Sequence, residues 1–338
     1  MRGILGLLLG AGWVAAAFAR GEGEDAVAPA LAAAPVASRL RLEPVGLSTP
    51  TVPQPGKAPV ILIPGLWMGP RTWEPMIRAL SSDPEVAASY QFWTFGYATG
   101  DPLPYSAGRL RIAIDEARRR LDPDYTDRAL DRIVLIGHSM GGLVAKLAAV
   151  DSGDRLWRLV SDRRADQLAG DPADVALARD CLIFPARPDV RAIVFVATPH
   201  GGGTAEQGLL HDVASRLVTP PDPLLKAYHR LIAANPPDFF RPSFRGNLIT
   251  SIDEMRRDSP MLRELHELRP PAGVEAHSII PVKNGPNGPG GDDGVVTYAS
   301  AHLDGVGSES IVPVGHFCQD APAVIAEVRR ILLDLDRR

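Results

Sequence analysis

The sequence predicts an α/β fold in which helices cover both faces of a mostly parallel sheet. After Lys57, short runs rich in Val, Ile and Phe alternate with amphipathic segments, which is the pattern of parallel strands joined by helical crossovers. The chain has 338 residues, of which 45% are hydrophobic, so it can bury a large core. Together these observations favour one large α/β domain over two separate domains.

The N-terminal 19 residues have the layout of a secretory signal peptide. A basic residue precedes an uncharged apolar run from Ile4 to Ala19, which is shorter than the roughly 20 apolar residues of a membrane span. We therefore expect export to the periplasm or the extracellular space, or a membrane anchor if residues 1–19 are not cleaved. Residues 20–57 are rich in Ala and Pro and predict a linker, so the main domain is expected over 58–338.

Six runs predict the strands of the sheet. They are residues 60–64, 91–97, 132–137, 191–199, 276–282 and 309–315. Residues 39–45 leave open one further edge strand ahead of the main domain. Between the second and third runs, residues 106–121 predict a helix that packs on the sheet, because one apolar stripe runs from Leu110 to Leu121 at helical spacing.

Two insertions interrupt this alternation. Residues 151–188 are mostly charged, and we expect them to form peripheral packing helices. Residues 204–272 leave the carboxyl end of the fourth predicted strand and place Leu209, Val213 and Leu217 at helical spacing. Insertions at this end of a parallel sheet surround the substrate crevice, so residues 204–272 predict a helical lid or cap. Permanent burial of that apolar face in the core is the alternative.

Residues 137–141, Gly-His-Ser-Met-Gly, fit the pattern Gly-x-Ser-x-Gly that presents a serine on a sharp strand-to-helix turn. Ser139 follows the third predicted strand directly and precedes an apolar helical run. Such a turn holds the serine in a strained conformation, and its neighbours must be small because strand and helix approach closely, as Gly137 and Gly141 permit. The N–H groups at the helix start favour developing negative charge, so Ser139 is a candidate nucleophile.

The charge balance argues against nucleic-acid binding. Asp and Glu (40) outnumber Lys and Arg (36), and no basic stretch is interleaved with aromatic residues that could stack on bases.

Five motifs resemble those of the α/β-hydrolases, and within that superfamily those of bacterial serine esterases and lipases related to the GPI inositol-deacylase type. The motifs are VILIPGLWMGPRTWEPMIRAL from residue 60, IGHSMGG from 136, VFVATPHGGG from 194, GDDGVVTYASA from 291 and GHFCQ from 315. The resemblance implies an α/β-hydrolase fold with a helical lid or cap insertion and a catalytic triad, and it says little about the substrate.

In this family the triad follows the chain order Ser, Asp, His, in which the histidine takes the serine proton and the acid orients the histidine. The resemblance implies His316, in the loop after the last strand, as the base, with His302 as the runner-up. The pattern Asp-Gly-x-Val places the acid at Asp293, directly before the glycine. Asp292 remains an alternative for the catalytic acid. A further alternative is that both carboxylates only shape the turn. Of the other histidines, His138 is expected to pack beside the nucleophile.

The resemblance also implies the oxyanion donors. These are the backbone N–H groups of Met140, the residue after the nucleophile, and of Leu66 in the first loop. The sequence departs from the His-Gly-x loop of lipases, because Pro64 stands in place of the usual histidine. A backbone donor at Leu66 survives this change. His200 is expected to border the pocket without acting as a base.

No metal or cofactor is expected. Calcium-dependent bacterial lipases carry an aspartate ligand two residues after the catalytic histidine, where this chain has Cys318, and no oxygen-rich cluster replaces it. The two cysteines, Cys181 and Cys318, lack the further ligands of a zinc site. They either form one disulfide, as an oxidising compartment would allow, or remain buried free thiols.

The resemblance implies a serine hydrolase that cleaves carboxylic esters through an acyl-enzyme, and the expected signal peptide predicts that it is exported. The expected substrate is a small-molecule or lipid ester, with transient contact with lipid surfaces. An acyltransferase with the same triad is the nearest alternative. A non-catalytic binding protein on this scaffold is a further alternative, and the presence of all three triad residue types argues against it.

Overall fold

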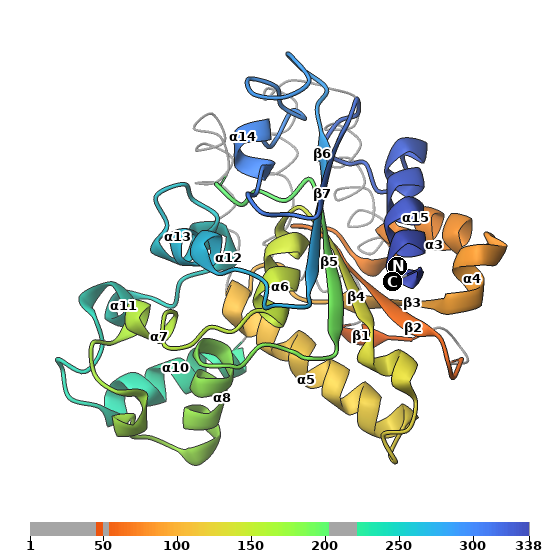
Figure 1. The fold of residues 1–338 in the computed structure, drawn as a ribbon. Coiled ribbons are helices and arrows are strands. Elements are labelled where there is room, and N and C mark those ends of the chain that lie inside the picture. The colour runs from red at the N-terminus through yellow and green to blue at the C-terminus, as the bar shows by residue number, and fades with distance from the viewer. Residues whose placement is uncertain (1–44, 50–53, 203–221, 338) are drawn as a thin grey trace, which may run out of the picture.

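The computed structural model describes residues 45–49, 54–202 and 222–337, in which seven strands form one sheet (Figure 1). The strands are β1 (Gly46–Ser48), β2 (Ala58–Ile63), β3 (Tyr90–Gly96), β4 (Ile133–His138), β5 (Val190–Val196), β6 (Glu275–Pro281) and β7 (Ser308–Val312). Their order across the sheet is β1-β3-β2-β4-β5-β6-β7. β1 pairs antiparallel with β3 and every other pair is parallel, so the predicted α/β-hydrolase fold with a mostly parallel sheet is confirmed.

The helices form two layers around the sheet and a separate group beside it (Figure 1). They are α3 (Glu74–Ser81), α4 (Pro84–Ser89), α5 (Leu103–Leu121), α6 (Met140–Ala149), α7 (Trp157–Val160), α8 (Pro172–Leu182), α10 (Asp222–Ala234), α11 (Pro242–Gly246), α12 (Ser251–Glu254), α13 (Pro260–Glu267), α14 (Tyr298–Ala301) and α15 (Pro322–Asp336). Short 3-10 turns occur at Pro70–Trp73, Arg128–Asp131 and Ala165–Gln167. Within the described ranges, no helix is both long enough and apolar enough to cross a bilayer.

Both faces of the sheet are buried, because side chains alternate between the two helical layers. In β2, Val60 and Leu62 pack with α3 and α15, whereas Ile61 and Ile63 pack with α5 and α6. Figure 1 shows α5 and α6 on one side of the sheet and α3, α4 and α15 on the other. This double burial explains why the strands are continuous apolar runs in the sequence.

The strand order changes direction at β2 and β4, whose carboxyl ends lead into the first loop and to Ser139. β3 pairs with one edge of β2 and β4 with the other edge. The chain connections after β2 and after β3 therefore run to opposite sides of the sheet. Open α/β sheets form their ligand sites at this kind of switch point, where the loops after neighbouring strands separate. The first loop follows β2 at Pro64, and Ser139 follows β4.

All six predicted strands exist, with boundaries that differ by up to three residues. The prediction that residues 191–199 and 309–315 are strands to their last residues is wrong, because β5 ends at Val196 and β7 at Val312. The edge strand β1 begins just after the stretch suggested for it and inside the predicted linker, where Leu47 pairs with Phe95 and packs against the core. The predicted signal peptide lies outside the described residues.

The two insertions pack on each other. Residues 151–188 form α7 and α8, which together with α10 and the turn before α11 enclose an aromatic cluster beside the sheet, as expected for peripheral packing helices. The cluster is built by Trp157, Leu168, Leu231, Phe239 and Phe240. The later part of the second insertion behaves differently, because the leucines of α13 are buried in the main core against α6.

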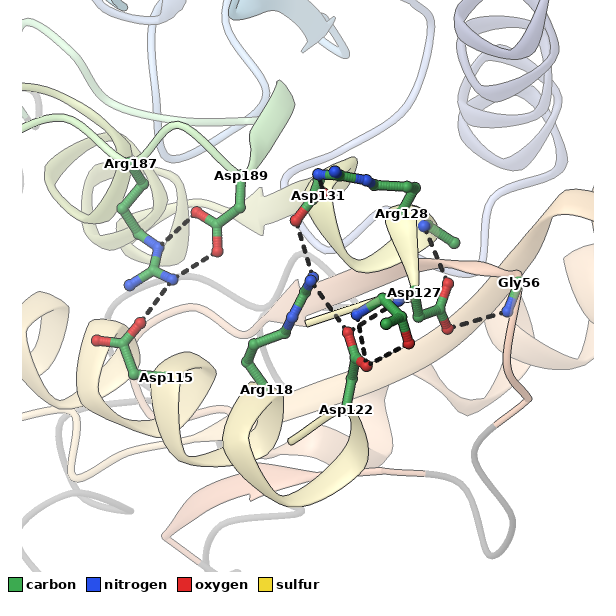
Figure 2. A network of polar contacts seen from close by, with 11 residues as sticks. Gly56, Asp115, Arg118, Asp122, Asp127, Arg128, Asp131, Arg187 and Asp189 are labelled. Carbon is green, nitrogen blue, oxygen red and sulfur yellow. Dashed lines mark hydrogen bonds and ion pairs between the residues drawn. The ribbon is translucent and has the colours of Figure 1, made fainter. Parts of the chain in front are cut away.

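Figure 2 shows a polar network at the amino-terminal ends of β4 and β5. Arg118 of α5 bridges Asp122 at 3.1 Å and Asp131 at 2.9 Å, and Arg187 pairs with Asp189 at 2.6 Å. Asp131 lies two residues before β4 and Asp189 directly precedes β5. Arg187 also pairs with Asp115 of α5 at 2.9 Å, so these ion pairs fix α5 to the sheet. The network lies at the opposite end of the strands from the predicted nucleophile and has a structural role.

A buried carboxyl joins α12 to α5. Glu254 is buried and accepts the N–H of Leu103, the first residue of α5, at 2.6 Å. Burial raises the pKa of Glu254 from its ordinary value of 4.5 to about 8. Between these values the folded protein holds a proton that the unfolded chain has lost. The contribution of Glu254 to the free energy of unfolding is therefore present below pH 4.5 and is lost as the pH rises towards 8.

We expect Glu254→Gln to remove this loss of stability while keeping an acceptor for the N–H of Leu103. The free energy of unfolding of the variant should exceed that of the wild type by an amount that grows with pH, at up to about 1.4 kcal/mol per pH unit. Urea unfolding of both proteins between about pH 4 and pH 9 measures the difference. Two stability curves that run parallel over this range would contradict the prediction.

Candidate active site

The nucleophile elbow has the strained geometry that its sequence predicts. Ser139 lies between β4 and α6 with φ 52° and ψ −126°, a left-handed conformation that is unfavourable for a non-glycine residue. A Cβ on Gly137 would lie 2.4 Å from the carbonyl oxygen of Gly141, and one on Gly141 would lie 2.3 Å from the backbone of β2. Both glycines are therefore required by the close approach of strand and helix.

A third glycine was not predicted to matter. A Cβ on Gly142 would lie 1.9 Å from the hydroxyl of Thr198, which follows β5. The contact joins α6 to the neighbouring strand rather than to its own, so the local Gly-x-Ser-x-Gly pattern carries no signal for it. The run of two glycines at 141 and 142 is the only sequence feature that could have indicated it.

The structure brings Ser139, His316 and Asp293 into one hydrogen-bonded chain. Nε2 of His316 lies 3.0 Å from Oγ of Ser139, and Nδ1 of His316 lies 2.7 Å from Oδ2 of Asp293. His316 and Asp293 are buried, at 6% and 3% exposure, while the serine is partly accessible. An imidazole held between a hydroxyl and a carboxylate can accept the hydroxyl proton and is stabilised when it becomes charged.

The two adjacent aspartates have different roles. The second carboxylate oxygen of Asp293 accepts the N–H groups of Val295 and Val296 at 2.8 and 2.6 Å, which fixes its orientation towards His316. Asp292 turns the other way, and its Oδ1 accepts the N–H of Gly294 at 2.8 Å. Among the described residues Asp293 contacts His316 and Asp292 does not, so this geometry favours Asp293 as the candidate acid.

His302 lies apart from this chain of hydrogen bonds. Its ring stacks on Tyr298, and its Nδ1 lies 2.6 Å from a carboxylate oxygen of Glu309. The hydrogen bond that His302 donates to this carboxylate raises the pKa of His302. A histidine that pairs with an acid on β7 and stands 42% exposed is a surface ion-pair residue, and it does not contact Ser139.

Two buried histidines flank the site. His138, directly before the nucleophile, is fully buried, and its Nε2 lies 2.8 Å from the carbonyl oxygen of His316. His200 packs the edge of its ring against Phe195 at 4.6 Å between centroids. Burial lowers the pKa of His200 well below its ordinary value. His200 is buried, at 1% exposure, and the expectation that it borders the pocket stays a prediction.

The expected oxyanion donors lie beside Ser139. A Cβ on Gly65 would lie 3.1 Å from Cβ of Ser139, so the first loop touches the elbow. Leu66 follows in that loop and Met140 begins α6. Across the part of the chain that the structure describes, neither N–H has a hydrogen-bond partner, which leaves both available to an oxyanion.

Contacts that sequence reasoning missed hold the first loop in place. The hydroxyl of Tyr97 donates to the carbonyl of Pro64 at 2.8 Å, and the N–H of Trp67, whose φ is 57°, donates to the hydroxyl of Thr99 at 3.2 Å. The carbonyl of Thr99 in turn accepts the hydroxyl of Ser251 at 2.5 Å. The second insertion is thereby tied to the oxyanion loop through the loop after β3.

The cysteines do not pair. Cys181 on α8 and Cys318 after His316 are free thiols, and burial raises the pKa of both, that of Cys181 to about 12. The disulfide alternative is therefore wrong.

Among the described residues, no three His, Cys, Asp or Glu side chains are grouped so that they could hold a metal ion.

The geometry predicts opposite outcomes for the two candidate bases. His316→Ala should lower kcat for ester turnover by at least about 10³-fold, whereas His302→Ala should leave it within about threefold of wild type. Because only a neutral imidazole can accept the serine proton, kcat/KM of the wild type and of His302→Ala should both fall along the same curve as the pH is lowered. An active His316→Ala enzyme beside an inactive His302→Ala enzyme would reverse the assignment.

A mostly parallel sheet, a strained serine between strand and helix, and an Asp–His pair from the loops after β6 and β7 together define a protein of the α/β-hydrolase class. Residues 60–328 match the model of the Alpha/beta hydrolase family, and the chain belongs to that family. No curated protein matches the sequence.

Several solved structures are similar in fold. Lipase 1 from Pelosinus fermentans is 14% identical, with a TM-score of 0.51 over 83% of this chain and 98% of that chain. The mature lipase BlEst2 from Bacillus licheniformis is 14% identical, with a TM-score of 0.48 over 86% and 96%. The metagenomic carboxyl esterase MGS0156 is 18% identical, with a TM-score of 0.41 over 90% and 81%. At these identities the likeness is one of fold, and the narrower resemblance to the inositol-deacylase type stays a prediction.

Proposed function

We propose that the protein is an exported serine hydrolase that cleaves carboxylic esters through an acyl-enzyme on Ser139. The observation that carries the proposal is the hydrogen-bonded chain from Ser139 through His316 to Asp293. It is supported by the N–H groups of Leu66 and Met140, which have no hydrogen-bond partner among the described residues, and by the family to which the chain belongs. The similar fold from Pelosinus fermentans is that of a protein named as a lipase, which agrees with this reaction class.

In the proposed reaction, Nε2 of His316 takes the proton of Ser139 while Oγ attacks the ester carbonyl carbon. The negative charge that develops on the carbonyl oxygen is bound by the N–H groups of Leu66 and Met140, and Asp293 stabilises the imidazolium. The imidazolium then gives its proton to the leaving alcohol. A water molecule, activated by the same histidine, attacks the acyl-enzyme and regenerates the serine.

A panel of p-nitrophenyl esters with rising acyl length tests the proposed function. Turnover of at least one ester, together with loss of turnover after reaction with an aryl phosphonate that labels a nucleophilic serine, is the expected result. The absence of both would contradict the proposal and favour a binding protein. If turnover occurs, product analysis with an added alcohol distinguishes hydrolysis from acyl transfer, because a transferase would give the new ester instead of the free acid.

We propose further that residues 204–272 cap the site and select the acyl chain. The insertion leaves the carboxyl end of β5, and Ser251 is linked through Thr99 to the oxyanion loop, so its later part is connected to the loop that carries Leu66. Leu262 and Leu265 anchor this part in the core. The helix expected around residues 209–217 lies outside the described residues.

If the cap opens as a lid, emulsified esters with medium or long acyl chains should be hydrolysed several-fold faster than dissolved ones, because an open lid exposes its apolar face to the lipid surface. The measurement follows initial rates across the solubility limit of each ester. A fixed cap would instead leave a small pocket. No increase at the interface, together with fastest turnover of acetate and butyrate esters, would contradict a lid.

A further inference from the structure

His138, which occupies the variable position before the nucleophile, contacts three parts of the site at once. Its ring lies 5.0 Å from the ring of His316, and its Nε2 is 2.8 Å from the carbonyl oxygen of the same residue. On the other side, a Cβ on Gly65 of the oxyanion loop would lie 2.9 Å from Nδ1 of His138. The ring therefore fills the space between the oxyanion loop and the loop of the base.

The hydrogen bond to the carbonyl of His316 fixes the tautomer of His138. A carbonyl oxygen can only accept, so Nε2 of His138 carries the proton and donates it. Nδ1 is then unprotonated, and it has no hydrogen-bond partner among the residues that the structure describes. Burial, with the neighbouring His316 as a second cause, lowers the pKa of His138 to about 3. His138 is thus a neutral donor throughout the pH range in which a serine hydrolase works.

The N–H group of His138 helps to hold the main chain of His316 in place. The N–H of His316 donates to the carbonyl of Asp293 at 3.0 Å, which ties the base to the acid loop. Its carbonyl accepts from His138, which is adjacent in sequence to Ser139 and so ties the base to the elbow. Both main-chain polar groups of His316 are therefore held, the N–H by Asp293 and the carbonyl by the residue directly before Ser139. An error of about 1 Å in such a position can cost on the order of 10²-fold in rate.

The neutrality of His138 is also needed electrostatically. In the proposed reaction His316 becomes an imidazolium, with its ring 5.0 Å from that of His138. A second positive charge at this distance in a buried site would oppose the first. A neutral N–H donor holds the backbone without that repulsion. A lysine or arginine could reach the carbonyl only by introducing such a charge.

We propose that His138 is a positioning residue for the reaction, a neutral N–H donor that holds the His316 main chain at the distance at which Nε2 meets Oγ of Ser139. The inference rests on the proposed function. It assigns a chemical requirement to the residue before the serine, a position that the Gly-x-Ser-x-Gly pattern leaves free. The position requires an uncharged hydrogen-bond donor as far from the backbone as Nε2 of histidine. The side-chain amide of glutamine can also supply such a donor.

The test compares His138→Leu, which has no donor, with His138→Gln, which keeps one at similar reach, and with His302→Leu as a control that removes a histidine away from the site. Active-site titration with an aryl phosphonate counts the competent serines in each preparation, and kcat and KM for a p-nitrophenyl ester are expressed per titrated site. We expect His138→Leu to lower kcat by roughly 10- to 100-fold with KM within about threefold. His138→Gln and His302→Leu should stay within about threefold of wild type in both constants.

The outcomes separate the inference from the function on which it rests. If kcat per titrated site is unchanged in His138→Leu, or falls equally in the Leu and Gln variants, the N–H of His138 does not position the base and the inference fails alone. If the wild type neither turns over any ester nor reacts with the phosphonate, the proposed function fails and the inference with it. Should His138→Leu not fold, His138→Met supplies a second side chain without a donor, judged by the same two criteria.

Discussion

Replacing Ser139 by alanine is expected to lower kcat for ester hydrolysis by about 10⁴- to 10⁶-fold and to leave the protein folded. The hydroxyl oxygen is the atom that Nε2 of His316 faces at 3.0 Å, and no other described side chain stands in its place. Without it, His316 and Asp293 have no nucleophile to activate, so the remaining rate comes only from the oxyanion donors and from substrate binding.

The strained backbone at Ser139 provides an internal control for folding. The left-handed φ of 52° belongs to the turn and not to the hydroxyl, so Ser139→Ala should unfold at the same temperature as the wild type within a few degrees. Ser139→Gly should be equally inactive and more stable, by roughly 1 kcal/mol or more, because glycine adopts this conformation without strain. Thermal unfolding and ester turnover are measured on the same preparations. A tenth of the wild-type activity in Ser139→Ala would show that the nucleophile is another residue.

Much of the fold could be predicted from the sequence, because both faces of the sheet are buried and each parallel strand is a continuous apolar run. The helix over residues 106–121 was visible for a similar reason, since its buried stripe repeats at helical spacing. The strand β1 was harder to find, because it has three residues at the edge of the sheet and is surrounded by linker-like composition. Short edge strands depend on their partner, here β3, for their existence.

The insertions could not be assigned from local pattern alone. The buried leucines of α13 look like one face of any amphipathic helix, and only the tertiary structure shows that this face packs on α6 in the main core. The same limit applies to the aromatic cluster between α8 and α10. It joins residues of the first insertion, which was expected to be peripheral, to residues of the second, which was expected to be a lid.

The order of the site residues along the chain was readable, but the choice between neighbours was not. Asp292 and Asp293 differ by one position, and only the direction of each side chain in the turn distinguishes them. His302 and His316 both follow the acid loop, and the pairing of His302 with Glu309 depends on how β7 lies next to that loop. The link from His138 to the carbonyl of His316 spans 178 positions and has no sequence pattern of its own.

The second large effect is expected for Asp293→Asn, which should lower kcat by about 10⁴-fold at neutral pH while the protein stays folded. One carboxylate oxygen of Asp293 accepts two backbone N–H groups, from Val295 and Val296, and the other accepts Nδ1–H of His316. An asparagine has only one oxygen. Since two N–H donors demand that oxygen on the loop side, the amide NH₂ must face Nδ1 of His316.

That orientation places a donor where the imidazole also needs to donate. His316 can relieve the conflict only by moving its proton from Nδ1 to Nε2, and an Nε2 that carries a proton cannot accept the one on Ser139. Asp292→Asn is the matched control. Its single oxygen can still accept the N–H of Gly294, and its amide does not contact the base, so kcat should stay within about threefold of wild type. The measurement is kcat of the two variants at pH 7. An inactive Asp292→Asn enzyme beside an active Asp293→Asn enzyme would show that Asp292 is the catalytic acid, and the tautomer argument would then apply to Asp292.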